Sequence, residues 1–360
     1  MPFVVNIVVF VAGLIAVFAT LLGAIRTFVL PRGDNVWLTR IVFRWTFALF
    51  RIRLRHIKDF ATLDRVLAFF APSTLFILPL VWMIAVLGGF MAMFWAAGVR
   101  PLGAAFLLSG SSLLTLGFAA VDGLLQTCLA FGAATIGLGL IALLIAYLPT
   151  MYAAFSHREM AVTLLEVRAG SPPSAITMIE RYHRIHNLTR LHDQWVAWEI
   201  WFGELEESHT TFAALSFFRS PQPDRSWITS AGTILDAAAL ANSTLDIPRD
   251  PSADLCIRAG FLALRHIADF FRLPHNPAPN PDDPISVTRE EFDAVCDRLA
   301  GEGVPLKPDR DQAWRDFAGW RVNYDAVLIE LARLIVAPAA PWTGHRPITF
   351  ELPNYRARIK

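Results

Sequence analysis

The sequence predicts an all-α membrane protein, with three apolar helices that cross a bilayer, an amphipathic helix, and a mostly helical domain after them. First, 54% of the 360 residues are hydrophobic and 18% are charged, which leaves more apolar side chains than one soluble core needs. Second, charged residues are scarce between residues 66 and 156 and return at ordinary density afterwards. Third, the uncharged stretches are long enough to cross a bilayer. This composition and the net charge of +1 exclude a disordered chain and a protein that coats nucleic acid.

The first predicted element, residues 1–30, is an N-terminal spanning helix. Residues 2–25 carry no charged side chain. At ~1.5 Å per residue this stretch is about 36 Å long, against a hydrocarbon core of about 30 Å. A cleaved signal peptide is the alternative, but no basic region precedes the apolar run and no small-x-small cleavage site followed by a polar start appears. We therefore expect the helix to be retained.

The second element, residues 31–65, is basic and amphipathic. Nine Lys or Arg residues lie between Arg26 and Arg65, so the positive-inside rule places this segment in the cytoplasm and the N-terminus outside. Residues 36–57 fit a helix at the membrane surface, with Arg40 and Arg44 one turn apart and aromatic side chains in the headgroup boundary. The alternative is a basic flank without defined structure, which leaves the topology unchanged.

Residues 66–150 form an apolar block whose only charged residues are Arg100 and Asp122. Residues 72–98 are long enough to span outward, and residues 123–148 are long enough to span back inward.

Prolines mark positions along these two spans. Pro72 suits the first turn of the outward helix, and Pro79 should kink it. The inward helix is expected to end at Pro149.

Between the two spans, residues 101–122 begin and end on the same, outer side of the membrane. Such a segment cannot be a third complete crossing, so a re-entrant loop is the economical prediction. Irregular backbone at membrane depth is tolerated only where it is buried in protein or lines a water-filled path. A short buried helix hairpin is the alternative.

This loop contains Thr115-Leu116-Gly117-Phe118, which resembles the selectivity filter of potassium channels and related pore-loop cation channels. The family pattern is a short pore helix followed by Thr-Val-Gly-Tyr-Gly, often with Phe in place of Tyr, and residues 104–114 would be the pore helix. The resemblance implies a homotetramer around a central axis, with potassium or another monovalent cation bound by filter carbonyls. It implies an outer helix, a re-entrant pore loop and an inner helix within residues 66–150. It covers less than a quarter of the chain.

The outer end of the loop departs from that pattern. Ala119 stands where the family has its second glycine, Ala120 stands where an aspartate usually follows, and Asp122 comes two positions later. Alanine at a position that needs a positive φ costs roughly 1 kcal/mol or more. The mouth formed by Ala119 and Asp122 is therefore expected to be reshaped, which implies weaker selectivity or a non-conducting relative.

The inner helix contains Gly132, Gly137 and Gly139. In the family a glycine five or six turns beyond the filter is the gating hinge, and Gly139 lies nearest to that place. The alternative is that a glycine such as Gly132 lets a neighbouring helix approach closely.

Residues 151–360 are expected to form a cytoplasmic domain dominated by helical periodicity. Pro-rich loops are expected at 272–284 and 304–308, and strand character appears only at 347–352. Helices are expected at 157–169, 172–219 (one or two), 226–242, 251–272, 288–300 (opened by a Thr288–Glu291 capping box) and 309–337.

This domain has no strand followed by G-x-G-x-x-G and no Walker sequence, so we expect no nucleotide cofactor. Two Glu-x-x-His pairs, Glu180 with His183 and Glu206 with His209, have the spacing of di-iron helix bundles, but ordinary ion pairs on a solvated helix face are the simpler interpretation. The sequence shows no pairing of a nucleophile with a base that would indicate an enzyme. The three cysteines are widely spaced and give no zinc or disulfide pattern: Cys128, Cys256 and Cys296. An aromatic series at helical spacing indicates a packing stripe: Trp195, Trp198, Trp201 and Phe202.

The resemblance implies a homotetrameric, plasma-membrane cation channel for potassium or weakly selective for monovalent cations. It would conduct through the filter carbonyls and be gated by its inner helix under the influence of the cytoplasmic domain. The alternative is a non-conducting, membrane-anchored scaffold or sensor that acts through that domain. A third possibility, a membrane-tethered metalloenzyme, rests only on the two Glu-x-x-His pairs.

Overall fold

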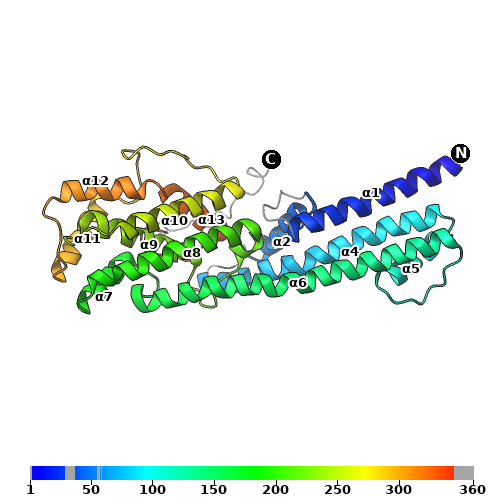
Figure 1. Ribbon diagram of the computed structural model, residues 1–360, viewed down its shortest axis with the longest axis horizontal. Helices are drawn as coiled ribbons and strands as arrows, with labels where there is room; N and C mark the ends of the chain where they lie inside the picture. The colour runs from blue at the N-terminus through cyan, green and yellow to red at the C-terminus, as the bar shows by residue number, and fades with distance from the viewer. Residues whose placement is uncertain (1, 29–36, 55–56, 58, 344–360) are drawn as a thin grey trace. The chain divides into compact units, whose positions relative to one another are not determined.

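The computed structural model describes residues 2–28, 37–54, 57 and 59–343, and the chain forms two compact units (Figure 1). Unit 1 comprises Met1–Arg53 and Phe69–Ala153, and unit 2 comprises Leu54–Ala68 and Ala154–Lys360. Apart from one isolated bridge between Leu245 and Leu306, the described residues form helices, turns and loops. The predicted all-α class is confirmed.

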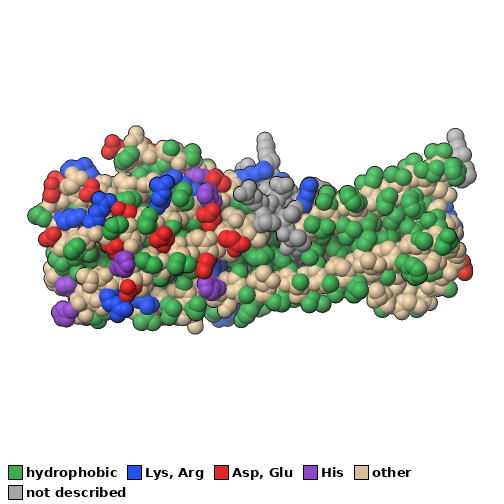
Figure 2. All heavy atoms as spheres, in the orientation of Figure 1, with side chains coloured by type: hydrophobic (Ala, Val, Ile, Leu, Met, Phe, Trp, Pro, Cys, Tyr) green, Lys and Arg blue, Asp and Glu red, His purple; other side chains and the backbone are tan. Residues whose placement is uncertain are grey.

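Unit 1 contains the apolar helices. Within the described part of the chain, three helical stretches are long and apolar enough to cross a membrane, at Phe3–Thr27, Phe60–Ala96 and Leu124–Ala169, which supports the prediction of a membrane protein. On the face seen in Figure 2, the coloured side chains of this unit are mostly hydrophobic, whereas charged side chains gather on unit 2. Its helices are α1 (Pro2–Phe28), α2 (Trp37–Leu54), α4 (Phe70–Ala96), α5 (Leu102–Leu113) and the first part of α6 (Leu124–Ala169).

Helices α1 and α4 pack closely at a pair of glycines. A Cβ added to Gly13 would lie 2.5 Å from the carbonyl oxygen of Gly89, and one added to Gly89 would lie 2.6 Å from Val17 Cγ2. Neither position has room for a side chain, so the two backbones approach as small residues allow in membrane helices.

Helix α2 occupies the stretch for which an amphipathic helix was expected, but three of its aromatic side chains pack on protein. Phe43, Phe47 and Phe50 surround Phe70 at the start of α4 in edge-to-face contacts, with ring centroids 5.7–6.2 Å apart. Trp45, at 71% exposure, is the aromatic residue of α2 that remains open to a lipid interface. These three rings therefore pack on protein, and the position of α2 at the headgroup boundary stays a prediction.

The expected helix end at Pro149 is also wrong, because α6 continues through it to Ala169. Proline removes one backbone donor, yet membrane helices tolerate it where neighbouring groups take up the freed carbonyls. The Thr150 hydroxyl donates to the carbonyl of Ala146 at 3.1 Å, in the turn that Pro149 disturbs. Pro79 likewise lies inside a continuous α4.

Unit 2 is built around α9 (Trp227–Thr244), which is buried along nearly its whole length. It contacts α7, α10, α12 and α13, and these helices supply most of the apolar core. The other elements of unit 2 are α3 (Phe60–Leu67), the end of α6, α7 (Ala175–Arg184), η1 (Leu188–Arg190), α8 (Leu191–Thr211), η2 (Ala213–Phe217), α10 (Pro251–Phe270), α11 (Arg289–Gly301), α12 (Arg310–Arg321) and α13 (Asp325–Ile335).

The capping box at the start of α11 is confirmed. The amide of Glu291 donates to Thr288 Oγ1 at 3.2 Å, and the amide of Thr288 donates to Glu291 Oε2 at 2.9 Å. The predicted strand at 347–352 lies outside the described residues.

The prediction of a single helix over 309–337 is wrong, because the helix is interrupted between α12 and α13. At the break Asn323 Nδ2 donates to the carbonyls of Gly319 and Trp320, at 2.9 and 3.2 Å, and so satisfies the end of α12. Buried Arg321 and Tyr324, which flank the break, both bond to Asp236 of α9. This central cluster turns the chain at a point that helical periodicity alone does not reveal.

Two attachments meet in the turn formed by η2 and the two residues after it. Arg158 of α6 donates to the carbonyls of Leu215 and Phe218 at 2.9 and 2.8 Å. Arg219 is paired with Asp64 of α3, which immediately precedes α4 in the chain. The segments that lead into the outer and inner apolar helices are thus held by one short turn of unit 2.

Candidate functional site

Helix α5 runs back alongside the helices that precede and follow it. Ser109 Oγ donates to the carbonyl of Leu87 in α4 at 2.9 Å, and a Cβ added to Gly137 of α6 would lie 1.9 Å from the carbonyl oxygen of Leu113. Gly137 is 13 residues into α6, so the last turn of α5 lies about 20 Å along α6 from its start. Gln126 Nε2 meanwhile donates to the carbonyl of Ala97 at 3.0 Å, which joins the start of α6 to the end of α4.

The chain therefore leaves the end of α4, descends through α5, and returns through residues 114–123 to the start of α6. The described structure has α5 at Leu102–Leu113, close to the predicted pore helix at 104–114. This descent and return is the geometry that a re-entrant loop requires.

Ser111 on α5 organises the returning loop. The amides of Leu116 and Gly117 both donate to its carbonyl oxygen, at 2.8 and 3.3 Å, and the amide of Ala119 donates to its hydroxyl at 3.1 Å. Ser111 is 2% exposed, so these bonds are sheltered from solvent. One residue thus accepts three hydrogen bonds from four consecutive loop positions.

These bonds fix the direction of the loop carbonyls. In a trans peptide the C=O of one residue points opposite to the N–H of the next, and every peptide bond of this loop is trans. Because the amides of Leu116, Gly117 and Ala119 point toward Ser111, the carbonyls of Thr115, Leu116 and Phe118 point away from α5. A row of carbonyl oxygens therefore lies on the opposite face of the loop.

The backbone angles explain how consecutive carbonyls share one face. In an extended strand they alternate between faces, but here φ changes sign along the loop, from −87° at Leu114 to +56° at Thr115, and again to +70° at Gly117. Leu116 and Phe118 keep ordinary φ values. Gly117 adopts its positive φ without a Cβ penalty, whereas Thr115 is held there with its hydroxyl donating to the carbonyl of Leu114 at 2.8 Å.

The predicted filter residues are exposed in the single chain. Leu116 and Phe118 are 61% and 64% exposed, and Thr115 and Gly117 are open as well. Asp122, also exposed, is the acidic residue nearest to the loop in sequence. The loop backbone on this face is therefore not covered by the rest of the described chain.

The outer position differs from the family pattern in its backbone as well as in its side chain. Ala119 lacks the positive φ expected at the second filter glycine, and its amide bonds to Ser111 instead. The strain expected at this alanine is therefore absent, and its amide is held by a hydrogen bond instead.

Of the three inner-helix glycines, Gly137 makes the close approach, because it receives the end of α5. A Cβ at Gly132 would meet the Phe90 ring at an ordinary 3.9 Å, and one at Gly139 would meet nothing within 4 Å. The close-packing role suggested for Gly132 thus belongs to Gly137, and the hinge at Gly139 stays a prediction.

The two Glu-x-x-His pairs do not assemble into one site. Glu180 accepts two bonds from Arg298, at 2.5 and 2.7 Å, and Glu206 pairs with His266 at 2.7 Å. His183 lies near Gly303. Among residues 2–28, 37–54, 57 and 59–343, no group of three or more acidic, histidine or cysteine side chains could hold a metal ion.

His209 belongs instead to a buried cluster with Arg158 and Glu159. Its Nε2 lies 3.2 Å from Arg158 Nη1, and Arg158 Nη2 lies 2.7 Å from Glu159 Oε1. Burial, and then the adjacent guanidinium, hold the pKa of His209 well below 6.5, so the imidazole is neutral and bonds to the fixed charge. The aromatic series of α8 (Trp195, Trp198, Trp201 and Phe202) is buried in the core, which confirms a packing stripe.

Sequence reasoning missed Ser111. It lies in a Ser-rich stretch, but the signal that distinguishes it from Ser109 and Ser112 is the path of the loop amides, which no spacing rule contains. Comparisons of the chain with protein-family models, with curated proteins and with solved structures return no match.

Proposed function

We propose that this protein is a homotetrameric pore-loop cation channel, for potassium or weakly selective for monovalent cations. The observation that carries the proposal is the carbonyl row of Thr115, Leu116 and Phe118, turned away from α5 by the three amides bound to Ser111. A dehydrated cation needs several oxygen ligands in place of its water shell, and one chain supplies too few of them. Four copies around an axis convert each carbonyl into a ring of four.

Conduction follows from this geometry. A cation exchanges water for the carbonyls of residues 115–118 at one ring after another, and each ring binds weakly enough to release it to the next. Helix α5 holds the loop at depth, and Gly137 lets its last turn rest against α6. The apolar outer surfaces of α1, α4 and α6 face lipid.

The reshaped mouth bears on selectivity. With the amide of Ala119 engaged by Ser111, the outermost site lacks the backbone conformation of the second filter glycine. The channel then has fewer tightly matched rings than a strict potassium filter, and Asp122 attracts cations to its entrance.

In the proposed topology the N-terminus lies outside the plasma membrane and unit 2 lies in the cytoplasm, as the positive-inside rule favours. Gating bends the inner helix near Gly139, and unit 2 biases it through the end of α6. No cofactor takes part, and the permeant ion is the ligand of the site.

Ion flux from liposomes that hold the purified full chain tests this proposal. Gly117→Asp places a negative, bulky side chain at an exposed filter position, and Asp tolerates a positive φ better than most residues, so the chain folds but conduction is lost. Gly103→Asp is the matched control, because Gly103 lies in the first turn of α5 with nothing within 4 Å of its Cβ position. We expect this variant to keep its flux.

Particle symmetry in detergent provides the second arm of the test. Four subunits with the carbonyl rows on one axis support the channel. Monomers or dimers, or flux indifferent to Gly117→Asp, would refute it and favour the membrane-anchored scaffold or sensor instead.

A further inference from the structure

Helix α2 carries a row of arginines along one of its faces. The helix contains four arginines and no acidic residue. Successive residues of a helix are turned by about 100°, so Arg40, Arg44 and Arg51 lie within about 40° of one another around its axis. Along the axis, Arg44 follows Arg40 by about 6 Å, and Arg51 follows Arg44 by about 10 Å. The fourth arginine, Arg53, lies on nearly the opposite side of the helix.

The protein does not neutralise this row. Among the residues that the structure describes, none of the three arginines has an ion pair with a carboxylate. Arg44 is exposed, and Arg40 and Arg51 are half-buried. Because like charges one helical turn apart repel each other, Arg40 and Arg44 destabilise the helix as it stands. An anion bound to both side chains would remove this cost.

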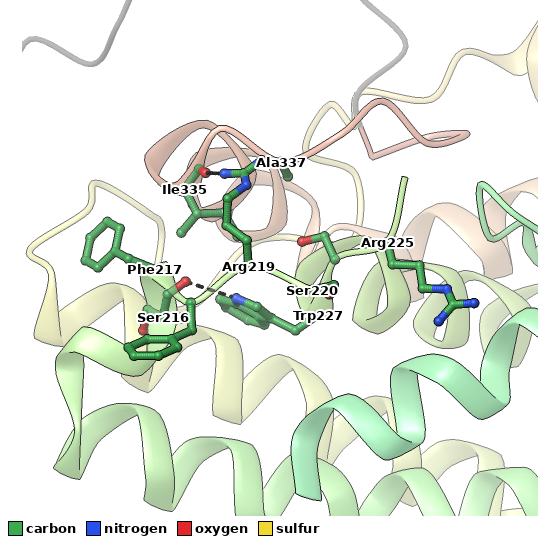
Figure 3. A pocket seen from close by; sticks show the side chains of 10 residues that line it. Ser216, Phe217, Arg219, Ser220, Arg225, Trp227, Ile335 and Ala337 are labelled. Atoms are coloured by element: carbon green, nitrogen blue, oxygen red, sulfur yellow. Dashed lines mark hydrogen bonds between the residues drawn. The ribbon is translucent and has the colours of Figure 1, made fainter. Parts of the chain in front are cut away.

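Most arginines of unit 2 are instead paired inside the fold. Arg219 pairs with Asp64 and donates to the carbonyl of Ile335 at 2.8 Å, a bond drawn in Figure 3, and Arg225 pairs with Glu166. The small cavity beside these two arginines has a volume of about 10 Å³, which one water molecule fills. The charges that call for an external partner are therefore those of α2.

An exposed apolar stripe runs along α2 next to the arginine row. Trp45, Leu49 and Ile52 lie within about 60° of one another, at 71%, 62% and 63% exposure. A polar anion such as free phosphate or a nucleic acid backbone would leave this stripe uncovered. A phospholipid carries its phosphate directly beside apolar chains, so it matches both features of the helix.

The packing of α2 places it at one end of two apolar helices. Thr39 Oγ1 lies 3.0 Å from Thr27 Oγ1, near the end of α1. Three phenylalanines of α2 surround Phe70, at the start of α4. In the membrane topology proposed above, the ends of these helices lie at the level of the phospholipid headgroups. The arginine row is then held at the depth of the lipid phosphates.

We propose that α2 is a binding site for an anionic phospholipid. The N–H groups of Arg40 and Arg44 donate to oxygens of its phosphate, Arg51 extends the positive row toward a neighbouring headgroup, and the apolar stripe packs against the acyl chains. A zwitterionic headgroup binds less well, because its own cation competes with the arginines for the phosphate. The inference rests on the membrane location of unit 1 and does not depend on conduction.

Lipid titration of the purified full chain in dodecyl maltoside tests the site, with binding followed by the midpoint of thermal unfolding. The probe is phosphatidylglycerol, and it is compared with phosphatidylcholine and with inorganic phosphate at the same ionic strength. We expect only phosphatidylglycerol to raise the midpoint. Arg44→Gln should raise the apparent dissociation constant for this lipid about fivefold. Arg53→Gln is the matched control, because Arg53 is also exposed on α2 but lies outside the row, and it should leave the constant unchanged.

The other outcomes would overturn the site. An equal rise with inorganic phosphate would assign the row to a free anion, and an equal rise with phosphatidylcholine would remove the role of the net charge. Equal losses of affinity in Arg44→Gln and Arg53→Gln would show a general attraction to a basic helix. If Arg44→Gln fails to fold, Arg51→Gln replaces it in the same comparison. Arg44→Lys keeps the positive charge and should bind phosphatidylglycerol more tightly than Arg44→Gln does.

Discussion

Gly137 offers the sharpest test of how the loop is held. Substituting alanine there places a Cβ 1.9 Å from the carbonyl oxygen of Leu113, and two of the nearest atoms belong to backbone, which cannot rotate away. Real Cβ contacts are essentially never shorter than 3.0 Å, so α5 and α6 must separate by about 1.1 Å. The displacement falls on the last turn of α5, two residues beyond Ser111.

The expected cost has two opposing parts. Alanine is favoured over glycine in a helix by up to about 1 kcal/mol, whereas overpacking in a well-packed contact costs about 1–3 kcal/mol. The control Gly132→Ala has the first part only, because its Cβ meets Phe90 at 3.9 Å. Because the first part is common to both variants and cancels, they should differ in stability by the overpacking cost of about 1–3 kcal/mol, with Gly137→Ala the less stable.

Two measurements on matched preparations decide the matter. Thermal unfolding in detergent should show a lower midpoint for Gly137→Ala than for Gly132→Ala. Liposome flux should be largely lost in the first variant and retained in the second, since binding geometry must hold to within about 0.5 Å. If both variants are equally stable and equally conductive, α5 does not rest on α6 and the argument that this contact holds the loop fails.

Three further predictions concern single contacts. Ser111→Ala removes the acceptor for the amide of Ala119 but leaves the backbone acceptor for the other two loop amides. Conduction should therefore persist, with an altered monovalent selectivity in reversal-potential measurements, and unchanged selectivity would contradict this role of Ser111. The pKa of His209 is lower in the folded protein than in the unfolded chain. The free energy of unfolding should therefore fall by about 1.4 kcal/mol per pH unit as the pH drops below 6.5, and His209→Gln should lack this slope in unfolding titrations. Thr288→Ala should lose about 0.5–2 kcal/mol of stability in the same assay, and an unchanged midpoint would show that the capping box of α11 contributes nothing.

The sequence was sufficient for elements with a strong local signal. The uncharged length of residues 2–25 matches α1, and the Thr288–Glu291 pair marks the start of α11. The short helix between the two spans was located within two residues at its start and one at its end. In each case the determinant lies within a few turns of the residue concerned.

Features that depend on distant partners could not be predicted in this way. The break at residues 322–324 follows from the bonds of Arg321 and Tyr324 to Asp236, about ninety positions earlier in the chain. The continuation of α6 through Pro149 follows from its surroundings rather than from the proline itself. The role of Ser111 required the direction of individual amides, which a pattern of residue types does not contain.

The turn that binds both Arg158 and Asp64 has a mechanical consequence. Arg158 lies within the unbroken helix α6, and Asp64 lies six residues before the start of α4. A displacement of this turn therefore acts at once on α6 and on the segment that precedes α4. Breaking either attachment should therefore leave the other segment bound to the turn, so that the two segments no longer move together.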